Sequence, residues 1–246
     1  MSKARDIADS TTTLDVDGGT IKLDGNYPVG TGNVALGDTA LDDPSLSGGY
    51  NTAIGNAALT LNSTGSNNTA LGYEAGNQLT SGAQNTLVGV AAGRQTTTGD
   101  YNVGVGNGTV YATTTGANNT ALGWNALRFN TTASNNTAVG YQAGYTNTTG
   151  NNLSALGFRA GYSMTSGGEN TFIGRDSGYG TTSGYRNTFL GYYSGRNVNT
   201  GHTNTFVGNL AGEDMSSGSK NVIIGGFNGN QGGLDIRTSS NNIVLS

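Results

Sequence analysis

Hydrophobic and polar positions recur with a strict 17-residue period along most of this chain. The clearest copy runs Asn68-Thr69-Ala70-Leu71-Gly72, and eleven such units extend from Asn51 to Arg237 without an insertion. An earlier copy begins at Asn33, 18 residues before Asn51. A short fixed period predicts a stack of identical structural units. The leading Asn returns at Asn85, Asn102, Asn119, Asn136, Asn170, Asn187, Asn204 and Asn221, and Leu153 replaces it once.

With positions numbered from the leading Asn, position 2 is mostly Thr, position 4 is always aliphatic, position 5 is always Gly and position 8 is mostly Ala. Residues two apart share one face of a strand, so positions 2 and 4 are expected to line a narrow β interior. Position 8 is expected on a second strand that faces the first. The predicted roll core is Ile54, Leu71, Val88, Val105, Leu122, Val139, Leu156, Ile173, Leu190, Val207 and Ile224.

Glycine marks two bends in each unit. The Gly at position 5 predicts a sharp bend or a positive φ, and the Gly that usually follows Thr or Ser near position 15 predicts a second one. Two short strands and two turns then form one flat coil, and twelve coils about 4.8 Å apart form a rod of about 55–60 Å. The Asn column is expected to form a ladder of side-chain amides between coils, besides its ordinary role in turns.

Position 3 is predicted to point away from the roll interior. A single thin roll buries too little apolar surface to offset the cost of ordering its backbone, so a second surface is expected to be buried by other chains. An outward apolar stripe along a rod is typical of an interface. The predicted trimer interface is Ala70, Leu87, Ala121, Ala138, Phe172, Phe189, Phe206 and Ile223, and the change from Ala to Phe predicts that the chains diverge along the rod.

The chain divides into three predicted parts: a distinct segment at 1–32, the repeats at 33–237 and a terminal strand at 238–246. Within the first part, Leu14 and Val16 alternate with polar residues before an Asp-Gly-Gly turn and a second alternating run, which predicts a β-hairpin or β-arch. Asp15 and Asp17 resemble the start of a calcium loop, but the later ligands are missing, so an acidic turn is expected.

Composition excludes several classes of function. The net charge is −4 and the Lys and Arg residues are scattered singly, which argues against nucleic-acid binding. There is no cysteine, so neither a disulfide framework nor a thiolate metal site is expected. Neither a signal-peptide pattern nor an apolar run of about 18 residues is present, so membrane insertion is not expected. No cofactor or metal is expected.

Candidate chemistry is sparse, and no enzymatic activity is predicted. His202 is the single histidine, and no nucleophile and base can be assembled around it from the sequence. The carboxylates lie in different coils, with no reason to choose a glycosidase pair. Position 6 carries aromatic residues that are expected either to stack on sugars or, with greater weight, to cover a neighbouring chain. These residues are Tyr73, Trp124, Tyr141, Phe158 and Tyr192.

The units resemble the head repeats of trimeric autotransporter adhesins, and Thr69-Ala70-Leu71-Gly72 and Val222-Ile223-Ile224-Gly225 carry the likeness over 33–237. The resemblance implies a left-handed parallel β-roll that assembles as a homotrimer. The opening, Met1 to Asp9, and the ending, Gly233 to Ser246, look instead like segments of tail-fibre and virion-fibre proteins of tailed phages.

The resulting hypothesis is a structural and adhesive virion fibre, made in the host cytoplasm and released by lysis. Residues 1–32 are expected to bind other virion proteins, and the rod to contact host surface polysaccharide or protein, or to brace another fibre. The proposed attachment residues are Lys3, Arg5, Ile7, Leu14 and Val16.

Three alternatives stay open. A bacterial adhesin head needs a secretion and anchoring segment. A polysaccharide depolymerase needs a catalytic pair. An ice- or mineral-binding surface needs a flat, regular array of Thr side chains, and it is disfavoured here because position 2 is placed inside the roll.

Overall fold

The computed structural model describes residues 14–15, 22–23 and 31–246. Two short strands, β1 (Leu14–Asp15) and β2 (Lys22–Leu23), pair antiparallel, as the hairpin prediction requires. The predicted attachment residues Lys3, Arg5, Ile7 and Val16 lie outside the described residues. The described residues contain no helix, so the chain is all-β as predicted.

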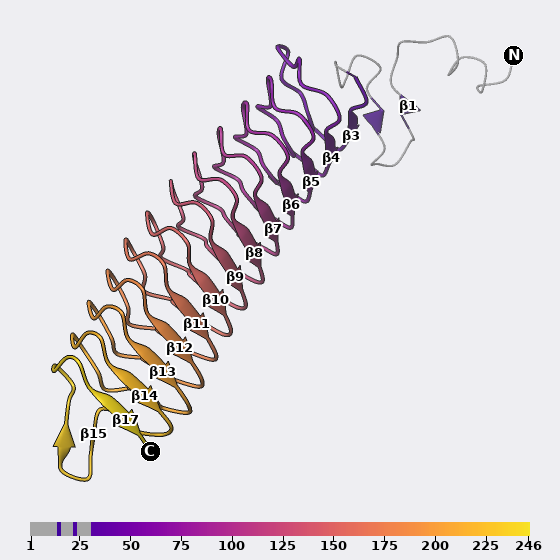
Figure 1. The fold of residues 1–246 in the computed structure, drawn as a ribbon. Coiled ribbons are helices and arrows are strands. Elements are labelled where there is room, and N and C mark those ends of the chain that lie inside the picture. The colour runs from indigo at the N-terminus through magenta and orange to yellow at the C-terminus, as the bar shows by residue number, and fades with distance from the viewer. Residues whose placement is uncertain (1–13, 16–21, 24–30) are drawn as a thin grey trace, which may run out of the picture.

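The repeats form one 13-stranded parallel sheet in which successive coils pair in chain order, a parallel β-solenoid (Figure 1). The strands are β3 (Val34–Leu36), β4 (Thr52–Ile54), β5 (Thr69–Leu71), β6 (Thr86–Val88), β7 (Val103–Val105), β8 (Thr120–Leu122), β9 (Thr137–Val139), β10 (Ser154–Leu156), β11 (Thr171–Ile173), β12 (Thr188–Leu190), β13 (Thr205–Val207), β14 (Val222–Ile224) and β17 (Ile243–Leu245). From β4 to β14 each strand pairs with the residues 17 positions further on, for example Thr69 with Thr86 and Leu71 with Val88. The offset is 18 residues between β3 and β4 and 21 residues between β14 and β17.

Each coil contains one three-residue strand, so the prediction of a second strand at position 8 is wrong. The chain turns instead, with left-handed residues at positions 7 and 9, such as Ala57 at φ 57° and Leu59 at φ 51°. This alternation directs the N–H groups of positions 7 and 9 to opposite neighbouring coils. The Glu74 N–H donates to the Asn56 carbonyl in the preceding coil (2.9 Å), and the Gly76 N–H donates to the Ala92 carbonyl in the following coil (2.9 Å). The coils are therefore hydrogen-bonded along this side without a second sheet.

The predicted glycine bend at position 5 is confirmed. Gly72 has φ 141°, and a Cβ there would lie 2.5 Å from the carbonyl oxygen of Gly89 in the next coil. At position 15 the reason for glycine is different, because Gly82 is not left-handed; a Cβ there would lie 2.5 Å from the Gly99 carbonyl oxygen. Close coil spacing, rather than a positive φ, selects glycine at that second position.

The prediction that positions 2 and 4 face the interior and position 3 faces outward is wrong. Position 3 is buried in every coil of the repeat, whereas positions 2 and 4 are half-buried or exposed; the Leu71 side chain is 45% exposed and Ala70 is 0% exposed. In a three-residue strand the middle side chain lies on one face and the two flanking side chains on the other, so only one of the three enters the narrow interior. The predicted roll core at position 4 is therefore on the surface, and the predicted trimer interface at position 3 is the core.

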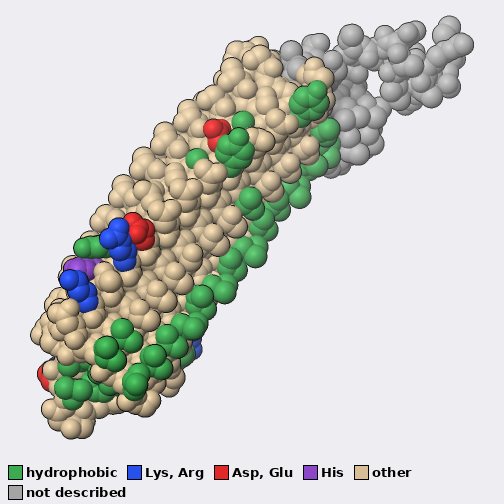
Figure 2. All heavy atoms as spheres, in the orientation of Figure 1, with side chains coloured by type: hydrophobic (Ala, Val, Ile, Leu, Met, Phe, Trp, Pro, Cys, Tyr) green, Lys and Arg blue, Asp and Glu red, His purple; other side chains and the backbone are tan. Residues whose placement is uncertain are grey.

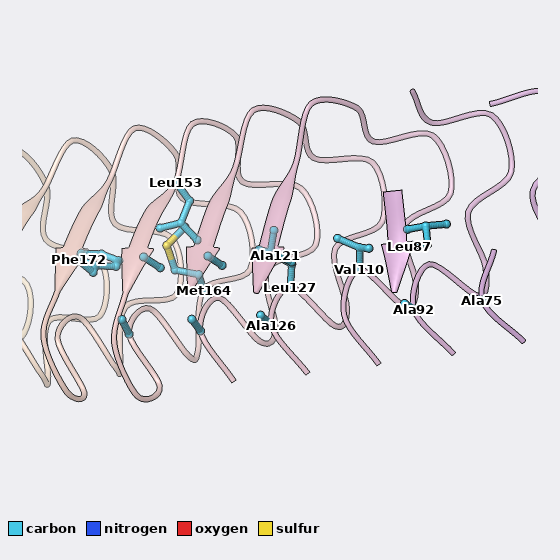
Figure 3. Close-up of a cluster of buried hydrophobic side chains, with 14 of the residues drawn as sticks. Ala75, Leu87, Ala92, Val110, Ala121, Ala126, Leu127, Leu153, Met164 and Phe172 are labelled. Carbon is cyan, nitrogen blue, oxygen red and sulfur yellow. The ribbon is translucent and has the colours of Figure 1, made fainter. Parts of the chain in front are cut away.

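Phe172, Phe189 and Phe206 accordingly face the interior and not a diverging trimer axis. Their rings stack from coil to coil, with centroids 5.2 Å apart for the first pair and 4.9 Å for the second. In the earlier coils, where position 3 is mostly small, other positions also fill the interior, and Figure 3 shows Val110 and Leu127 of position 9 within the coils. These side chains form one continuous hydrophobic core along the rod.

The predicted asparagine ladder is confirmed. The buried Asn51 side chain accepts hydrogen bonds through its Oδ1 from the Asn68 N–H (2.9 Å) and from Asn68 Nδ2 (3.2 Å). Asn68 Nδ2 also donates to the Gly82 carbonyl within its own coil (2.9 Å). The same pattern continues up the rod and is interrupted at Leu153, whose backbone N–H still donates to Asn136 Oδ1 (2.8 Å). The ladder satisfies buried amides that would otherwise be costly.

The last full coil is longer than the others. Asn242 Nδ2 donates to Asn221 Oδ1 (2.7 Å) across 21 residues rather than 17, which makes Asn242 the next member of the ladder. The additional residues form a small antiparallel hairpin, β15 (Asn230–Gln231) with β16 (Leu234–Asp235). β17 then completes the sheet, within the segment 238–246 predicted as a terminal strand.

Candidate interaction surfaces

The outward side chains of the sheet form two parallel columns, which we call the β-face: position 2 and position 4 of every coil. The position-4 column is aliphatic throughout, and Leu71, Leu122, Leu156, Leu190 and Ile224 are each 43–49% exposed. Figure 2 shows hydrophobic side chains in a stripe along the edge of the rod where Figure 1 places the strands. An uninterrupted apolar column of this length is typical of an interaction surface.

The hydroxyl groups of the position-2 column have no hydrogen-bond partner within the described residues. Thr residues at position 13 behave differently: the Thr80 hydroxyl donates to the Thr97 carbonyl in the next coil (3.1 Å), and the Thr97 hydroxyl donates to Thr114 (3.0 Å). Position 2 therefore presents hydroxyls to solvent or to another molecule. The column is Thr52, Thr69, Thr86, Val103, Thr120, Thr137, Ser154, Thr171, Thr188, Thr205 and Val222.

No residue at position 2 or 4 of the repeats is charged. The β-face thus combines a column of hydroxyls with a column of aliphatic side chains on a sheet in constant register. Such a surface has no electrostatic barrier to meeting a copy of itself, because like charges are absent from it.

Three of the five aromatic residues at position 6 stack on one another, whereas Tyr192 stacks on Tyr193 of its own coil. Trp124, Tyr141 and Phe158 form a column with ring centroids 4.9 and 5.1 Å apart and interplanar angles of 12° and 8°. Between neighbours in this stack the ring faces are covered. The sequence-based idea that these rings stack on sugars is therefore disfavoured within the column, since sugar stacking needs an open ring face.

A second aromatic column lies at position 10, in the same turn. Tyr145, Tyr162 and Tyr179 stack at 5.0 Å, with interplanar angles of 7° and 11°. Burial raises the pKa of Tyr162 above its usual value. This column was not noticed in the sequence, although Tyr recurs there at 17-residue spacing.

The single histidine and the carboxylates form no catalytic arrangement within the described residues. His202 stacks on Tyr185 at 4.7 Å, and its Nδ1 lies 3.3 Å from the Thr203 hydroxyl. Glu74, Glu169 and Asp176 each form an ion pair with arginine. No group of three or more His, Cys, Asp or Glu residues that could hold a metal ion occurs in the described part of the chain.

A shallow depression of about 520 Å³ lies beside the C-terminal hairpin, lined by Asp214, Ser216, Asp235, Arg237 and Thr238. The Arg237 guanidinium lies 2.8 Å from Asp235 and holds the pKa of that carboxyl below its usual value. Burial raises the pKa of the nearby Glu213, and the charge of Asp214 adds to the shift. Opposing shifts can mark an acid–base pair, but Asp235 is committed to its arginine, so no catalytic pair is assembled here.

Comparisons of the chain with family models, with curated proteins and with solved structures found no match. In the described residues there is also no helix with the length and apolar character needed to span a membrane. Function is therefore inferred from the geometry of this chain.

Proposed function

We propose that this protein is a structural rod that self-associates through its β-face into a parallel homotrimer and serves as a virion fibre. One observation carries the proposal: the uncharged, aliphatic position-4 column is exposed or half-buried along the whole sheet, and none of its residues from Ile54 to Ile224 is buried. Three-fold symmetry places the same column of each chain against its partners in register. The resemblance of the repeats to trimeric adhesin heads supports three chains, and the opening residues support a virion fibre.

Light scattering on the purified chain tests the assembly. The expected mass is about three times 24.9 kDa. Leu122→Glu with Leu156→Glu places carboxylates on the β-face at side chains already 47% and 49% exposed, so the coils should fold and the trimer should dissociate. Tyr101→Glu is the matched control, because Tyr101 is 53% exposed but lies at position 17, away from the β-face. A wild-type monomer would contradict the proposal.

The proposed attachment role of residues 1–32 has its own test. Removal of that segment should leave trimers of unchanged stability that no longer join virus particles. Normal incorporation of the shortened chain into particles would remove this part of the proposal.

The free hydroxyls favour a second candidate, an ice-binding surface. The reason for setting it aside was that position 2 lies inside the roll, and the structure shows the opposite. Regular hydroxyls and methyl groups on a sheet with coils about 4.8 Å apart could order water in a lattice. The two candidates use the same face and exclude each other. A monomer that shows thermal hysteresis supports ice binding, whereas a trimer without hysteresis supports the fibre.

A further inference from the structure

The middle of the rod is positively charged, although the whole chain carries −4. Residues 85–203 contain six arginines, no lysine and three carboxylates, a net charge of +3 with His202 neutral. In the sequence these arginines are scattered singly. The 17-residue winding of the chain determines which of them come together.

Five of the six arginines fall in the turn that follows the strand, at positions 6, 7 and 10. We call them the arginine band: Arg94, Arg128, Arg159, Arg175 and Arg196. Because each turn stacks on the next, these residues lie along one side of the rod, on a surface distinct from the β-face. The sixth, Arg186, is at position 17 in another part of the coil.

Aromatic rings hold several of these guanidinium groups. Arg128 lies over the Tyr111 ring at 4.7 Å, and Arg159 lies over the Tyr179 ring at 4.8 Å. Arg196 lies over the Tyr193 ring at 4.6 Å. Each contact keeps the cation in place without neutralising its charge, so less freedom is lost when an anion binds.

The carboxylates of the band do not neutralise all of its arginines. Buried Asp176 is shared by Arg159 (2.8 Å) and Arg175 (3.4 Å), so that cluster keeps one positive charge. Arg128 forms no ion pair with a carboxylate in the described residues; its Nη1 donates to Asn125 Oδ1 (2.7 Å). Arg94 is paired with Glu74 (2.6 Å), and Arg196 lies 3.8 Å from Glu213. The charge left over in the band is therefore that of Arg128 and of the Arg159–Arg175 cluster, in which the Arg175 side chain remains 55% exposed.

We propose that the arginine band binds an acidic polysaccharide that lies along the rod. The proposal rests on the adhesive function proposed above and names the class of ligand. Arg128 and Arg175 lie three coils apart, about 14 Å at the spacing of paired strands, so an extended glycan can meet both arginines with carboxylates along its length. The planar guanidinium is well matched to a carboxylate, and tyrosine hydroxyls beside it can bind sugar hydroxyls.

The aromatic stacks separate this ligand from two others. Single-stranded nucleic acid binds by stacking its bases on open aromatic faces, and neutral sugars use the same faces. In the columns of Tyr145, Tyr162 and Tyr179 the faces are covered by neighbouring rings 5.0 Å away. What the band presents is charge and hydroxyl groups, which favours an anionic glycan.

The test is isothermal titration of the full chain with alginate oligomers at low salt, with dextran and oligo-dT as comparison ligands. Arg128→Gln with Arg175→Gln removes two charges from the band and leaves Arg159 to pair with Asp176. The matched control, Arg186→Gln with Arg237→Gln, removes two charges elsewhere. We expect the first pair to weaken alginate binding about tenfold, the second less than about twofold, and added salt to weaken binding by the wild type.

Each contrary result overturns the proposal: no alginate binding, equal binding of dextran, tighter binding of oligo-dT, or an equal loss in the control pair, which would indicate net charge alone. Assembly is scored separately by light scattering and by the β-face variant Leu122→Glu with Leu156→Glu. A monomer that binds alginate through the band would refute the trimer and leave this site intact. A trimer that ignores alginate would do the reverse.

Discussion

Two regions of the rod share one backbone and fill it differently. In the coils that begin at Asn51 to Asn136, position 3 is small in all but one coil; in the coils that begin at Asn170, Asn187 and Asn204 it is Phe. Period, strand register and the asparagine ladder continue through both regions. The comparison shows that the backbone of the coil is specified separately from the residues that fill it.

The two regions fill the interior from different positions of the coil. Gly104 faces Val110 in one coil and Ala121 accompanies Leu127 in the next, whereas Phe189 stands against Gly195. A Cβ on Gly104 would lie 2.8 Å from the Val110 methyl, and one on Gly195 would collide with the Phe189 ring. In these coils a large residue at one of positions 3 and 9 stands against a small one at the other. Where both are small, as at Ala138 with Gly144, Leu127 and Leu153 of the neighbouring coils fill the space.

The largest effect is expected in the phenylalanine column. Phe189→Ala removes a fully buried ring that stacks on Phe172 and Phe206, so the free energy of unfolding should fall by about 3–5 kcal/mol. Urea unfolding measures it, with Phe189→Leu as the milder control. A loss below about 1 kcal/mol would mean that the column contributes no more than the small-residue coils do.

A transplant sharpens the comparison. Phe189→Ala together with Gly195→Leu reproduces the arrangement of Ala121 and Leu127, in which Leu127 adopts φ 51°. Leu at position 195 must take the left-handed φ of Gly195, 59°, at a cost of about 1–2 kcal/mol, so about half of the lost stability should return. If the double variant is no more stable than Phe189→Ala, a large residue at position 9 does not replace one at position 3.

The asparagine ladder should contribute equally in both regions. Asn102→Ala orphans the Asn119 N–H and the Gly116 carbonyl, and Asn204→Ala does the same to Asn221 and Gly218. Each variant should lose about 1–3 kcal/mol of unfolding free energy, because buried polar groups lose their partners. Thermal unfolding of the pair checks this, and a clear difference between them would show that the regions do differ in the backbone.

A smaller effect is expected at Val110, where the backbone of the first region is strained. Val110 is β-branched and left-handed at φ 44°, a strained conformation. Gly104→Ala alone meets the Val110 side chain, and Val110→Gly alone leaves a cavity, so each should cost about 1–2 kcal/mol. Val110→Gly relieves only one of the two contacts, since the Cβ at position 104 would still lie 2.9 Å from Thr109 Oγ1, so both changes together should cost less than the sum of the single losses. Additive losses would contradict this.

The sequence predicted the parallel stack, the glycine bend and the asparagine ladder, because each rests on a local rule that no other contact overrides. It did not predict which side of the strand faces inward. The alternation of side chains along a strand is compatible with either face pointing inward, and the aliphatic residues at position 4 favoured the wrong face. A usable signal is present in some coils, in which a large residue at position 3 or 9 stands against a small one at the other, as at Gly104 with Val110 and at Phe189 with Gly195.

The same error, the wrong choice of the inward-facing side of the strand, limited what the sequence could predict about the candidate surfaces. Because of it, the β-face was assigned to the interior and its free hydroxyls were overlooked. The arginines were visible at fixed repeat positions, since Arg94, Arg128 and Arg196 all stand at position 10. The distribution of charge along the linear chain does not reveal this cluster, because only the winding of the coils brings residues 17 or 34 positions apart close together on the surface.

The smallest predicted effect concerns acid. Among the described residues, one ion pair, Glu74 with Arg94, lies in the first region; the others lie from Arg159 onward. The hydrogen bond from Arg186 lowers the pKa of Glu169 below its ordinary value of 4.5. A lowered folded-state pKa stabilises the fold above the ordinary value and stops doing so as pH falls through the folded one.

Arg186→Gln should therefore unfold at nearly the wild-type temperature at pH 3 and slightly below it at pH 6. Both groups are exposed, so solvent screens the pair and the difference should be smaller than for any interior variant. Melting curves at the two pH values measure it, and subtraction from wild type cancels the other carboxylates. A larger loss at pH 3 than at pH 6 would have the wrong sign for this pair. A loss at pH 6 comparable to that of Phe189→Ala would show that surface charge, and not interior packing, separates the two regions.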